Sequence, residues 1–232
     1  LHGTFIAGIL SAKRHSSAPA ICPNCTLLIR PVFGEMVPGS EQMPSATPQE
    51  LAAAIIECID AGARVVNLSL ALAHLSTKGE QSLEEALNYA TRRGVIIVAA
   101  AGNQGTLGSS AITRHPWVIP VVACDLRGRP TSESNLGSSI GRQGVSAPGD
   151  NITSLDAQGQ SITFGGTSVA VPFVTGTIAL LWSEFPTATA GQIKCAIAQT
   201  TTIRRAAVVP PLLDAAAAYQ ILLTANVRRR VA

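Results

Sequence analysis

A serine, a histidine and an asparagine stand out in this sequence because each lies on its own glycine-containing stretch. Ser168 follows Gly165-Gly166-Thr167 and precedes an apolar run of small residues, which predicts a buried helix. The first N–H groups of a helix lack intrahelical partners and lie at the positive end of the helix dipole. Thr167 or Ser168 could therefore be a simple N-cap, or Ser168 could be a nucleophile whose oxyanion the helix stabilises.

The other two residues lie on separate elements far from the serine in sequence. His2 begins the small-residue stretch His-Gly-Thr-Phe-Ile-Ala-Gly, which predicts a closely packed helix. Asn103 follows the apolar run from Val95 to Gly102, which predicts a buried strand. An asparagine just past the carboxyl end of a strand in an α/β sheet can direct its amide into the crevice where ligands bind.

The motifs His-Gly-Thr at residue 2, Ala-Ala-Gly-Asn ending at residue 103 and Gly-Thr-Ser-x-Ala-x-Pro around residue 168 occur in this order. In motif and spacing the sequence, from His2 to about Ala218, resembles the subtilisin-like serine peptidases. The resemblance implies that Ser168 is the nucleophile and that His2 is the general base and later the general acid. It also implies that the Asn103 amide and the Ser168 backbone N–H form the oxyanion hole.

The same resemblance suggests which residues line the substrate site: Ser69, Leu70, Ala71, Ala101, Gly102, Arg114 and Thr167. The stretch from Ser69 to Ala71 would form one wall of the pocket for the residue before the cut. Arg114 falls where many relatives carry a small residue at the floor of that pocket. A guanidinium there would favour an acidic side chain through a bidentate pair, but Arg114 could equally point into solvent from a loop.

The family also requires an aspartate that orients the histidine, and in the family it precedes the histidine in an Asp-Thr/Ser-Gly context. The sequence begins one residue before His2, and the aspartates present, none in that context, are Asp60, Asp125, Asp150, Asp156 and Asp214. We therefore expect an upstream segment of the same protein to supply the aspartate. We also expect the chain as given to lack a strand of the sheet and to have little activity.

Length, composition and periodicity predict one domain. The chain has 232 residues, of which 47% are hydrophobic and 13% charged, typical of a compact protein with a well-buried core. The predicted strands are 26–32, 64–70, 95–101 and 117–124, and the predicted helices are 2–12, 48–61, 82–93, 168–183, 189–198 and 214–223. This alternation predicts a three-layer α/β fold whose mostly parallel sheet carries helices on both faces, without its N-terminal part. We expect a peptidase domain over 1–225 and a basic tail over 226–232.

Composition also excludes several classes of function and ligand. A net charge of +3 is too small to indicate nucleic-acid binding, and no uninterrupted apolar run reaches the roughly 18 residues that a membrane helix needs. We expect no calcium at the loop from Lys13 to Ala20, because it lacks the Asn- and Asp-rich oxygen ligands with which relatives bind that ion. We also expect no other metal and no cofactor. We expect His15, His74 and His115 at the surface, and a cis peptide before Pro116 as in the family.

The five cysteines give a weak indication of the compartment. Cys22 and Cys25 form a single C-x-x-C, which is either a pair of thiols or a strained local disulfide; one such pair cannot hold a structural zinc ion. The remaining cysteines, Cys58, Cys124 and Cys195, lie in apolar runs and are expected to be buried thiols. This pattern favours the cytoplasm, and an extracellular location is not excluded.

The stretch from Ala18 to Phe33 resembles, more narrowly, the peptidases of cyanobactin maturation, which cut a precursor peptide. We therefore expect a serine endopeptidase that processes a precursor peptide or protein. Two alternatives stay open: a peptide macrocyclase or transpeptidase, in which an amine replaces water, and a non-catalytic peptide-binding domain, suggested by the missing aspartate.

Overall fold

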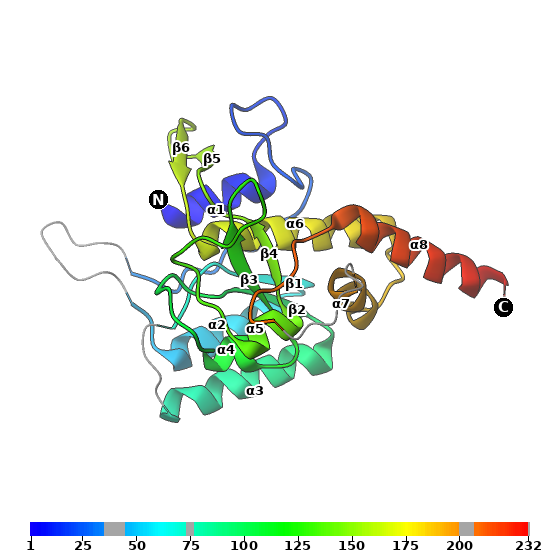
Figure 1. Cartoon of the computed structure of the whole chain (residues 1–232), viewed down its shortest axis with the longest axis horizontal. Coiled ribbons are helices and arrows are strands. Elements are labelled where there is room, and N and C mark those ends of the chain that lie inside the picture. Colours follow the sequence, from blue (N-terminus) through cyan, green and yellow to red (C-terminus); the bar gives the residue numbers. More distant parts are fainter. Residues whose placement is uncertain (35–44, 73–76, 200–206, 232) are drawn as a thin grey trace, which may run out of the picture.

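The computed structural model describes residues 1–34, 45–72, 77–199 and 207–231. Its elements along the chain are α1 (His2–Ser11), α2 (Pro48–Asp60), β1 (Val65–Leu68), α3 (Thr77–Arg93), β2 (Ile96–Ala100), α4 (Ala111–Arg114), β3 (Val118–Cys124), α5 (Ser138–Gln143), β4 (Val145–Pro148), β5 (Ile152–Leu155), β6 (Ser161–Phe164), α6 (Thr167–Glu184), α7 (Ala190–Ala198) and α8 (Ala215–Val231) (Figure 1).

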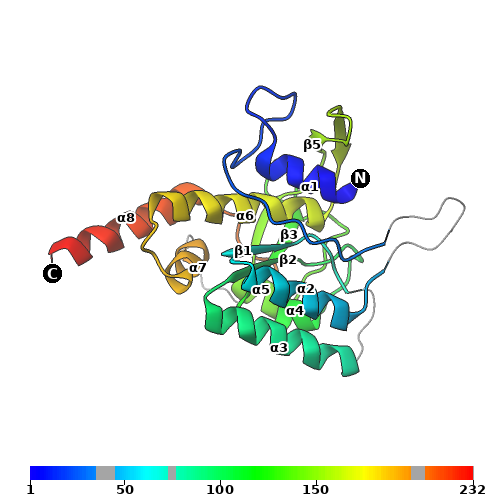
Figure 2. The ribbon, with the colours of Figure 1, turned by 180° about the vertical axis from the view of Figure 1, so that it is seen from behind.

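The central sheet is parallel and has the strand order β1-β2-β3-β4. Every residue of β2 and β3 is buried, in keeping with their uninterrupted apolar sequences. The strands β5 and β6 form a separate antiparallel hairpin that leads directly into α6. The hairpin packs against α1 (Figures 1 and 2), so the first helix and the segment before Ser168 are in contact.

Helices cover both faces of the sheet, and the alternation of side chains along β2 shows how. Ile96 and Val98 point into the core formed with α6, α7 and α8, whereas Ile97 and Ala99 point into the core formed with α2 and α3. Figure 1 shows these helices on opposite sides of the strands. The three-layer α/β fold with a mostly parallel sheet is therefore confirmed.

The helix starts follow local sequence signals. Glu50 N donates to Thr47 Oγ1 over 3.2 Å, and Thr47 N donates to Glu50 Oε2 over 2.7 Å, so the capping box expected before Pro48 is present. After α2 the chain turns at Gly62, whose φ is +90°, as expected from a glycine that ends a helix.

The strand predicted over Thr26–Val32 is absent, and these residues form neither strand nor helix. In the described part of the chain, β1 pairs with β2 alone, and no neighbouring strand offers the 26–32 segment a hydrogen-bonding partner. Leu28 and Ile29 consequently remain 52% and 66% exposed. A strand requires an adjacent backbone, and sequence preference alone cannot provide one.

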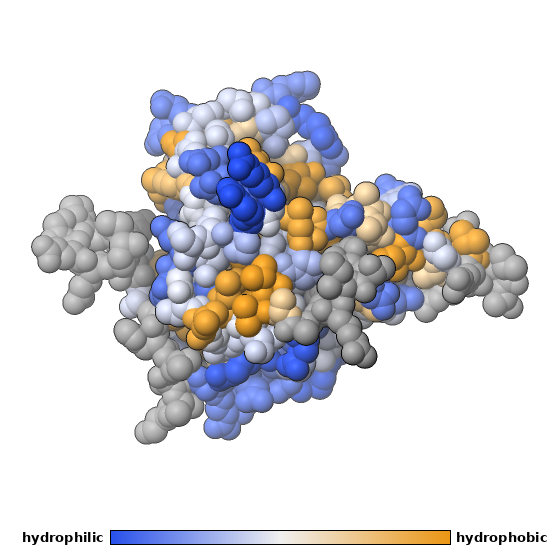
Figure 3. All heavy atoms as spheres, viewed as in Figure 1, coloured by the Kyte–Doolittle hydropathy of each residue, from blue (hydrophilic) through white to orange (hydrophobic). Residues whose placement is uncertain are grey.

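The C-terminal helix is longer than predicted. α8 continues to Val231 and includes most of the segment expected as a basic tail. It projects from the body of the molecule (Figures 1 and 2), and hydrophobic and hydrophilic residues are interspersed along it (Figure 3). Leu223 and Val227 are exposed on this helix.

The expectation for His115 was wrong. Its side chain is only 8% exposed, Nε2 lies 3.2 Å from Asn88 Oδ1, and Nδ1 accepts from Trp117 N over 3.3 Å. Both ring nitrogens are therefore bonded inside the protein. The described residues contain no cis peptide bond, so the cis bond expected before Pro116 is absent too. His15 is exposed as expected, and His74 lies outside the described residues.

Candidate active site

Ser168 lies in the first turn of α6, and its helix begins with glycine instead of a polar cap. The N-cap is Gly166, with φ +118°, so neither Thr167 nor Ser168 is the N-cap. Ser168 is partly exposed, while the residues that follow it on α6 are largely buried. Within the described residues no acceptor binds the Ser168 N–H, which is therefore available to a developing oxyanion.

Asn103 is held against the start of α6 by its side-chain oxygen. Oδ1 accepts from Thr167 N over 2.9 Å and from Thr167 Oγ1 over 2.8 Å. A backbone N–H can only donate, so the oxygen of the amide must face Thr167 and the NH₂ group must face away. A methyl group built on Gly166 would lie 2.9 Å from Asn103 Nδ2, which places the NH₂ group beside the residues that precede Ser168.

A second asparagine shapes the loop that carries Asn103. Asn135 Oδ1 accepts from the backbone N–H groups of Gln104 and Thr106, over 3.0 and 3.1 Å. Gly102, with φ +106°, donates its N–H to Thr167 Oγ1 over 3.2 Å. Nothing in the sequence around Asn135 identified this role, because it depends on contacts across 31 positions of the chain.

His2 begins α1 and reaches the carboxyl end of β1. The residue is exposed, but desolvation of the imidazole by the surrounding protein lowers the pKa of His2 below its ordinary value. A hydrogen bond to the backbone of Ser69 opposes this shift. A neutral imidazole is the form that can accept a proton from a serine hydroxyl.

Ser69 connects His2 to Ser168. Its hydroxyl donates to the backbone oxygen of Ser168 over 2.7 Å. The Ser69 hydroxyl in turn accepts from Asn67 Nδ2 over 2.8 Å, and Asn67 Oδ1 accepts from Thr175 Oγ1 over 2.9 Å. This series of hydrogen bonds links β1 and Ser69 to two positions on α6, Ser168 and Thr175. Asn67 was not predicted as a site residue; a polar side chain within the apolar run Val-Val-Asn-Leu was the available signal.

The other predicted substrate residues divide into two groups. Leu70 and Ala71 follow Ser69 at the end of β1, and Ala101 lies at the end of β2, so these residues lie at the same edge of the sheet. Arg114 ends α4, and its side chain is about half exposed and pairs with Glu80 over 3.5 Å. Its Nη1 donates to Ser109 O over 3.3 Å.

No described carboxylate bonds to His2, and the described residues contain no group of three or more His, Cys, Asp or Glu side chains placed to hold a metal ion. All five cysteines are free thiols, but the expected burial is confirmed for Cys124 alone: Cys58 is partly exposed and Cys195 is exposed. Within the described residues, no helix is both long and apolar enough to span a membrane.

Comparison with known proteins identifies the class to which this fold and site belong. The profile of the Subtilase family matches residues 1–221, and the chain belongs to this family. It is 33% identical over 202 residues to the thermostable alkaline protease of Halalkalibacterium halodurans, covering 87% of this chain and 52% of the relative. It is 32% identical over 201 residues to thermitase of Thermoactinomyces vulgaris, covering 86% and 66%. The chain thus spans about half the length of the alkaline protease.

Among solved structures, the chain is similar to proteases that mature cyanobactins. The protease domain of PatA, as the S218A mutant, superposes with a TM-score of 0.82 at 30% identity, over 97% of this chain and 81% of that one. The prenylagaramide maturation protease PagA superposes with a TM-score of 0.86 at 28% identity, over 95% and 82%.

Proposed function

We propose that this chain is the catalytic domain of a serine endopeptidase. His2 takes the proton from Ser168 Oγ as that oxygen attacks the scissile carbonyl, and returns it to the leaving amine. The oxyanion accepts hydrogen bonds from Asn103 Nδ2 and Ser168 N. Water then hydrolyses the acyl-enzyme. The observation that carries this proposal is the pair of hydrogen bonds that Thr167 N and Oγ1 donate to Asn103 Oδ1, because they leave the amide donors of Asn103 free for an oxyanion.

A complete triad requires a carboxylate to orient His2. We propose that a segment upstream of His2 in the full protein supplies it, because the aspartates of the described chain serve other contacts, as with Asp60 and Tyr89 or Asp125 and Arg129. Within the described residues the outer edge of β1 has no partner strand, and Leu28 and Ile29 are exposed; both observations support a neighbour on this side of the sheet.

The proposed substrate is a precursor peptide, and the proposed reaction is hydrolysis. The likeness to PatA and PagA at 28–30% identity supports this choice, whereas the likeness to the PatG macrocyclase domain is at 23% identity and supports the fold alone. The free thiols support a cytoplasmic location.

The test uses the full-length protein, with its upstream segment, and a fluorophosphonate probe. We expect labelling of the wild type and none of Ser168→Ala, together with hydrolysis of peptides by the wild type alone. Thr177→Ala is a suitable control, because this hydroxyl lies farther along the same helix and donates to Phe173 O. Absence of labelling in the folded full-length wild type would favour a non-catalytic peptide-binding domain.

We also retain the proposal that Arg114 favours an acidic residue before the cut. This role requires Arg114 to exchange its Glu80 partner for the substrate. A peptide library in which Asp or Glu at that position gives no gain in kcat/KM contradicts it.

A further inference from the structure

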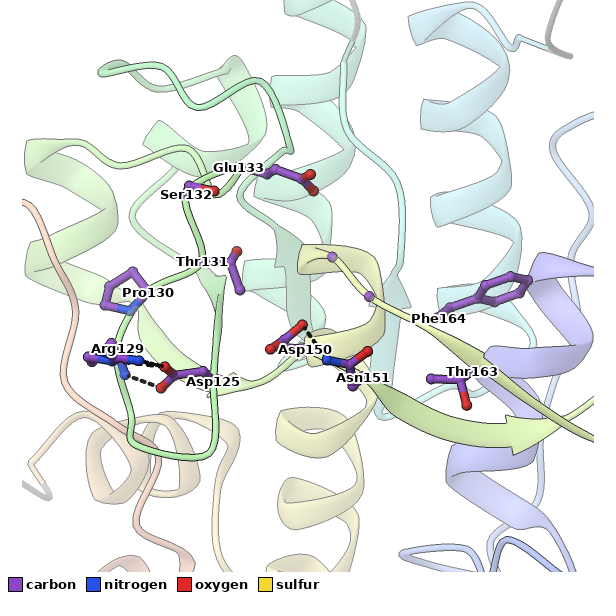
Figure 4. A pocket seen from close by; sticks show the side chains of 13 residues that line it. Asp125, Arg129, Pro130, Thr131, Ser132, Glu133, Asp150, Asn151, Thr163 and Phe164 are labelled. Atoms are coloured by element: carbon purple, nitrogen blue, oxygen red, sulfur yellow. Dashed lines mark hydrogen bonds and ion pairs between the residues drawn. The ribbon is translucent and has the colours of Figure 1, made fainter.

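A cavity of about 780 Å³ opens beside the start of α6. Three segments border it: residues 125–133 after β3, residues 149–151 after β4, and residues 163–166 from the end of β6 to the start of α6 (Figure 4). Gly166, two residues before the nucleophile, is part of its wall. The cavity is therefore continuous with the proposed active site.

The strand order places the cavity on one particular side of Ser168. Ser168 is bonded through its backbone oxygen to Ser69 after β1, and its neighbour Thr167 is bonded to Asn103 after β2. The cavity lies at the carboxyl ends of β3 and β4, on the opposite side from β1. A peptide that places the residue before the cut against Ser69–Ala71 therefore continues past Gly166 into the cavity with the residues after the cut.

Two backbone hydrogen bonds fix the cavity walls to the catalytic loops. Glu133 O accepts from Gly105 N over 2.8 Å, two residues after Asn103. Gly149 O accepts from Gly166 N over 2.7 Å, and Gly149 immediately precedes Asp150. Glu133 and Asp150 thus border one cavity from two loops (Figure 4), each anchored next to a group that would contact the scissile bond.

The charges of the side chains that line the cavity do not sum to zero. Arg129 forms an ion pair with Asp125, with Nε–Oδ2 and Nη2–Oδ2 distances of 2.8 and 2.7 Å. Glu133 and Asp150 have no cationic partner among the described residues, and Asp150 Oδ1 accepts only the neutral Asn151 amide over 3.1 Å. Both carboxylates are solvent-accessible, so the cavity holds two uncompensated negative charges.

We propose that this cavity binds the substrate residues that follow the scissile bond and selects lysine or arginine there. The inference rests on the proposed function, since it requires a peptide held across Ser168. Exposed ion pairs are weak and are screened by salt, so each carboxylate is expected to contribute about a threefold to fivefold preference, largely lost at ~1 M salt.

The test measures kcat/KM of the full-length protein on peptides that share the sequence before the cut and carry lysine, norleucine or glutamate after it. We expect lysine over norleucine over glutamate. Glu133→Gln and Asp150→Asn should each reduce the lysine-to-norleucine ratio about threefold to fivefold. Glu184→Gln is the matched control, because this exposed carboxylate lies about 24 Å along α6 from Ser168 and should leave the ratio unchanged.

Two failures can be told apart. If fluorophosphonate labels Ser168 and the norleucine peptide is cut, but the ratio is flat or favours glutamate, the cavity proposal is wrong and the proposed function stands. If the folded wild type neither labels nor cuts any peptide, the proposed function is wrong and the cavity proposal fails with it.

Discussion

At the residue scale, the candidate site depends on Thr167 as much as on the groups that would touch substrate. Its backbone N–H and hydroxyl both donate to Asn103 Oδ1, and its hydroxyl also accepts from Gly102 N. Thr167 is therefore a positioning residue for the oxyanion donor, and its side chain is 1% exposed.

We expect Asn103→Ala to lower kcat by roughly 10²–10³, the usual loss for one oxyanion donor, with little change in KM. Thr167→Ala removes only one of the two bonds to Asn103 Oδ1, and should lower kcat by about 10-fold. Because both variants act through one amide, Thr167→Ala should cost almost nothing in the Asn103→Ala background. Steady-state kinetics of the full-length variants measure this, and additive losses would show that Thr167 acts independently of Asn103.

His115 predicts a pH dependence of folding stability. Burial lowers the pKa of His115 below its ordinary value, so the unfolded chain takes up a proton at a higher pH than the folded chain does. The free energy of unfolding should therefore fall as pH decreases below about 6.5, and the fall should stop at the folded-state pKa.

Urea unfolding of wild type and His115→Gln between pH 7.5 and 5 checks this, since glutamine keeps a donor and an acceptor but does not titrate. We expect a smaller loss of stability in His115→Gln, and equal pH dependence would contradict the assignment. His15→Gln, which changes an exposed histidine, is the control.

At the element scale, helix starts decide where the functional groups lie. The helix α6 starts at a glycine whose φ of +118° strains any other residue, and a Cβ at this position would crowd Asn103 Nδ2. The helix α2 starts with a capping box that involves Thr47 and Glu50 and no residue of the candidate site. Substitutions at the two helix starts therefore allow effects on catalysis to be separated from effects on folding stability.

We expect Gly166→Ala to reduce stability by about 1–3 kcal/mol through backbone strain, and to reduce kcat further by displacing the Asn103 amide. Thr47→Ala should reduce stability by about 1 kcal/mol through loss of the cap, with unchanged kcat/KM. Chemical denaturation and kinetics of both variants distinguish the two effects. Full activity in Gly166→Ala would show that the amide does not need this glycine.

At the scale of the whole molecule, the described sheet is unevenly supported. β2 and β3 are buried and paired on both sides, whereas β1 pairs with β2 alone although it carries Asn67 and leads to Ser69. The strand that is linked to Ser168 is thus at an edge of the described sheet.

We expect amide hydrogens of β1 in the 232-residue chain to exchange faster than those of β2 and β3, because local opening requires less surface to be exposed there. Hydrogen exchange of this chain and of the full-length protein measures the difference. Addition of the upstream segment should slow exchange in β1 and leave β3 unchanged; equal rates in both proteins would show that the segment does not pair with β1.

The sequence by itself determined the elements whose signals are local. Capping residues and helical periodicity placed α1, α2, α6 and α7, apolar runs placed β2 and β3, and the order of three motifs gave the family. Local signals suffice here because a cap is formed by residues three positions apart, and because an uninterrupted apolar run fits a strand that is buried on both faces.

Only the tertiary structure decided the features that depend on partners distant in sequence. Whether residues 26–32 form a strand depends on a neighbouring backbone, and whether His115 is buried depends on Asn88 and Trp117. The hydrogen bonds from Thr175 through Asn67 and Ser69 to Ser168 join α6 to β1 and the residues that follow it, and the acidic cavity is bordered by three separate segments of the chain. Such contacts arise from packing, so single-sequence patterns carry no direct record of them.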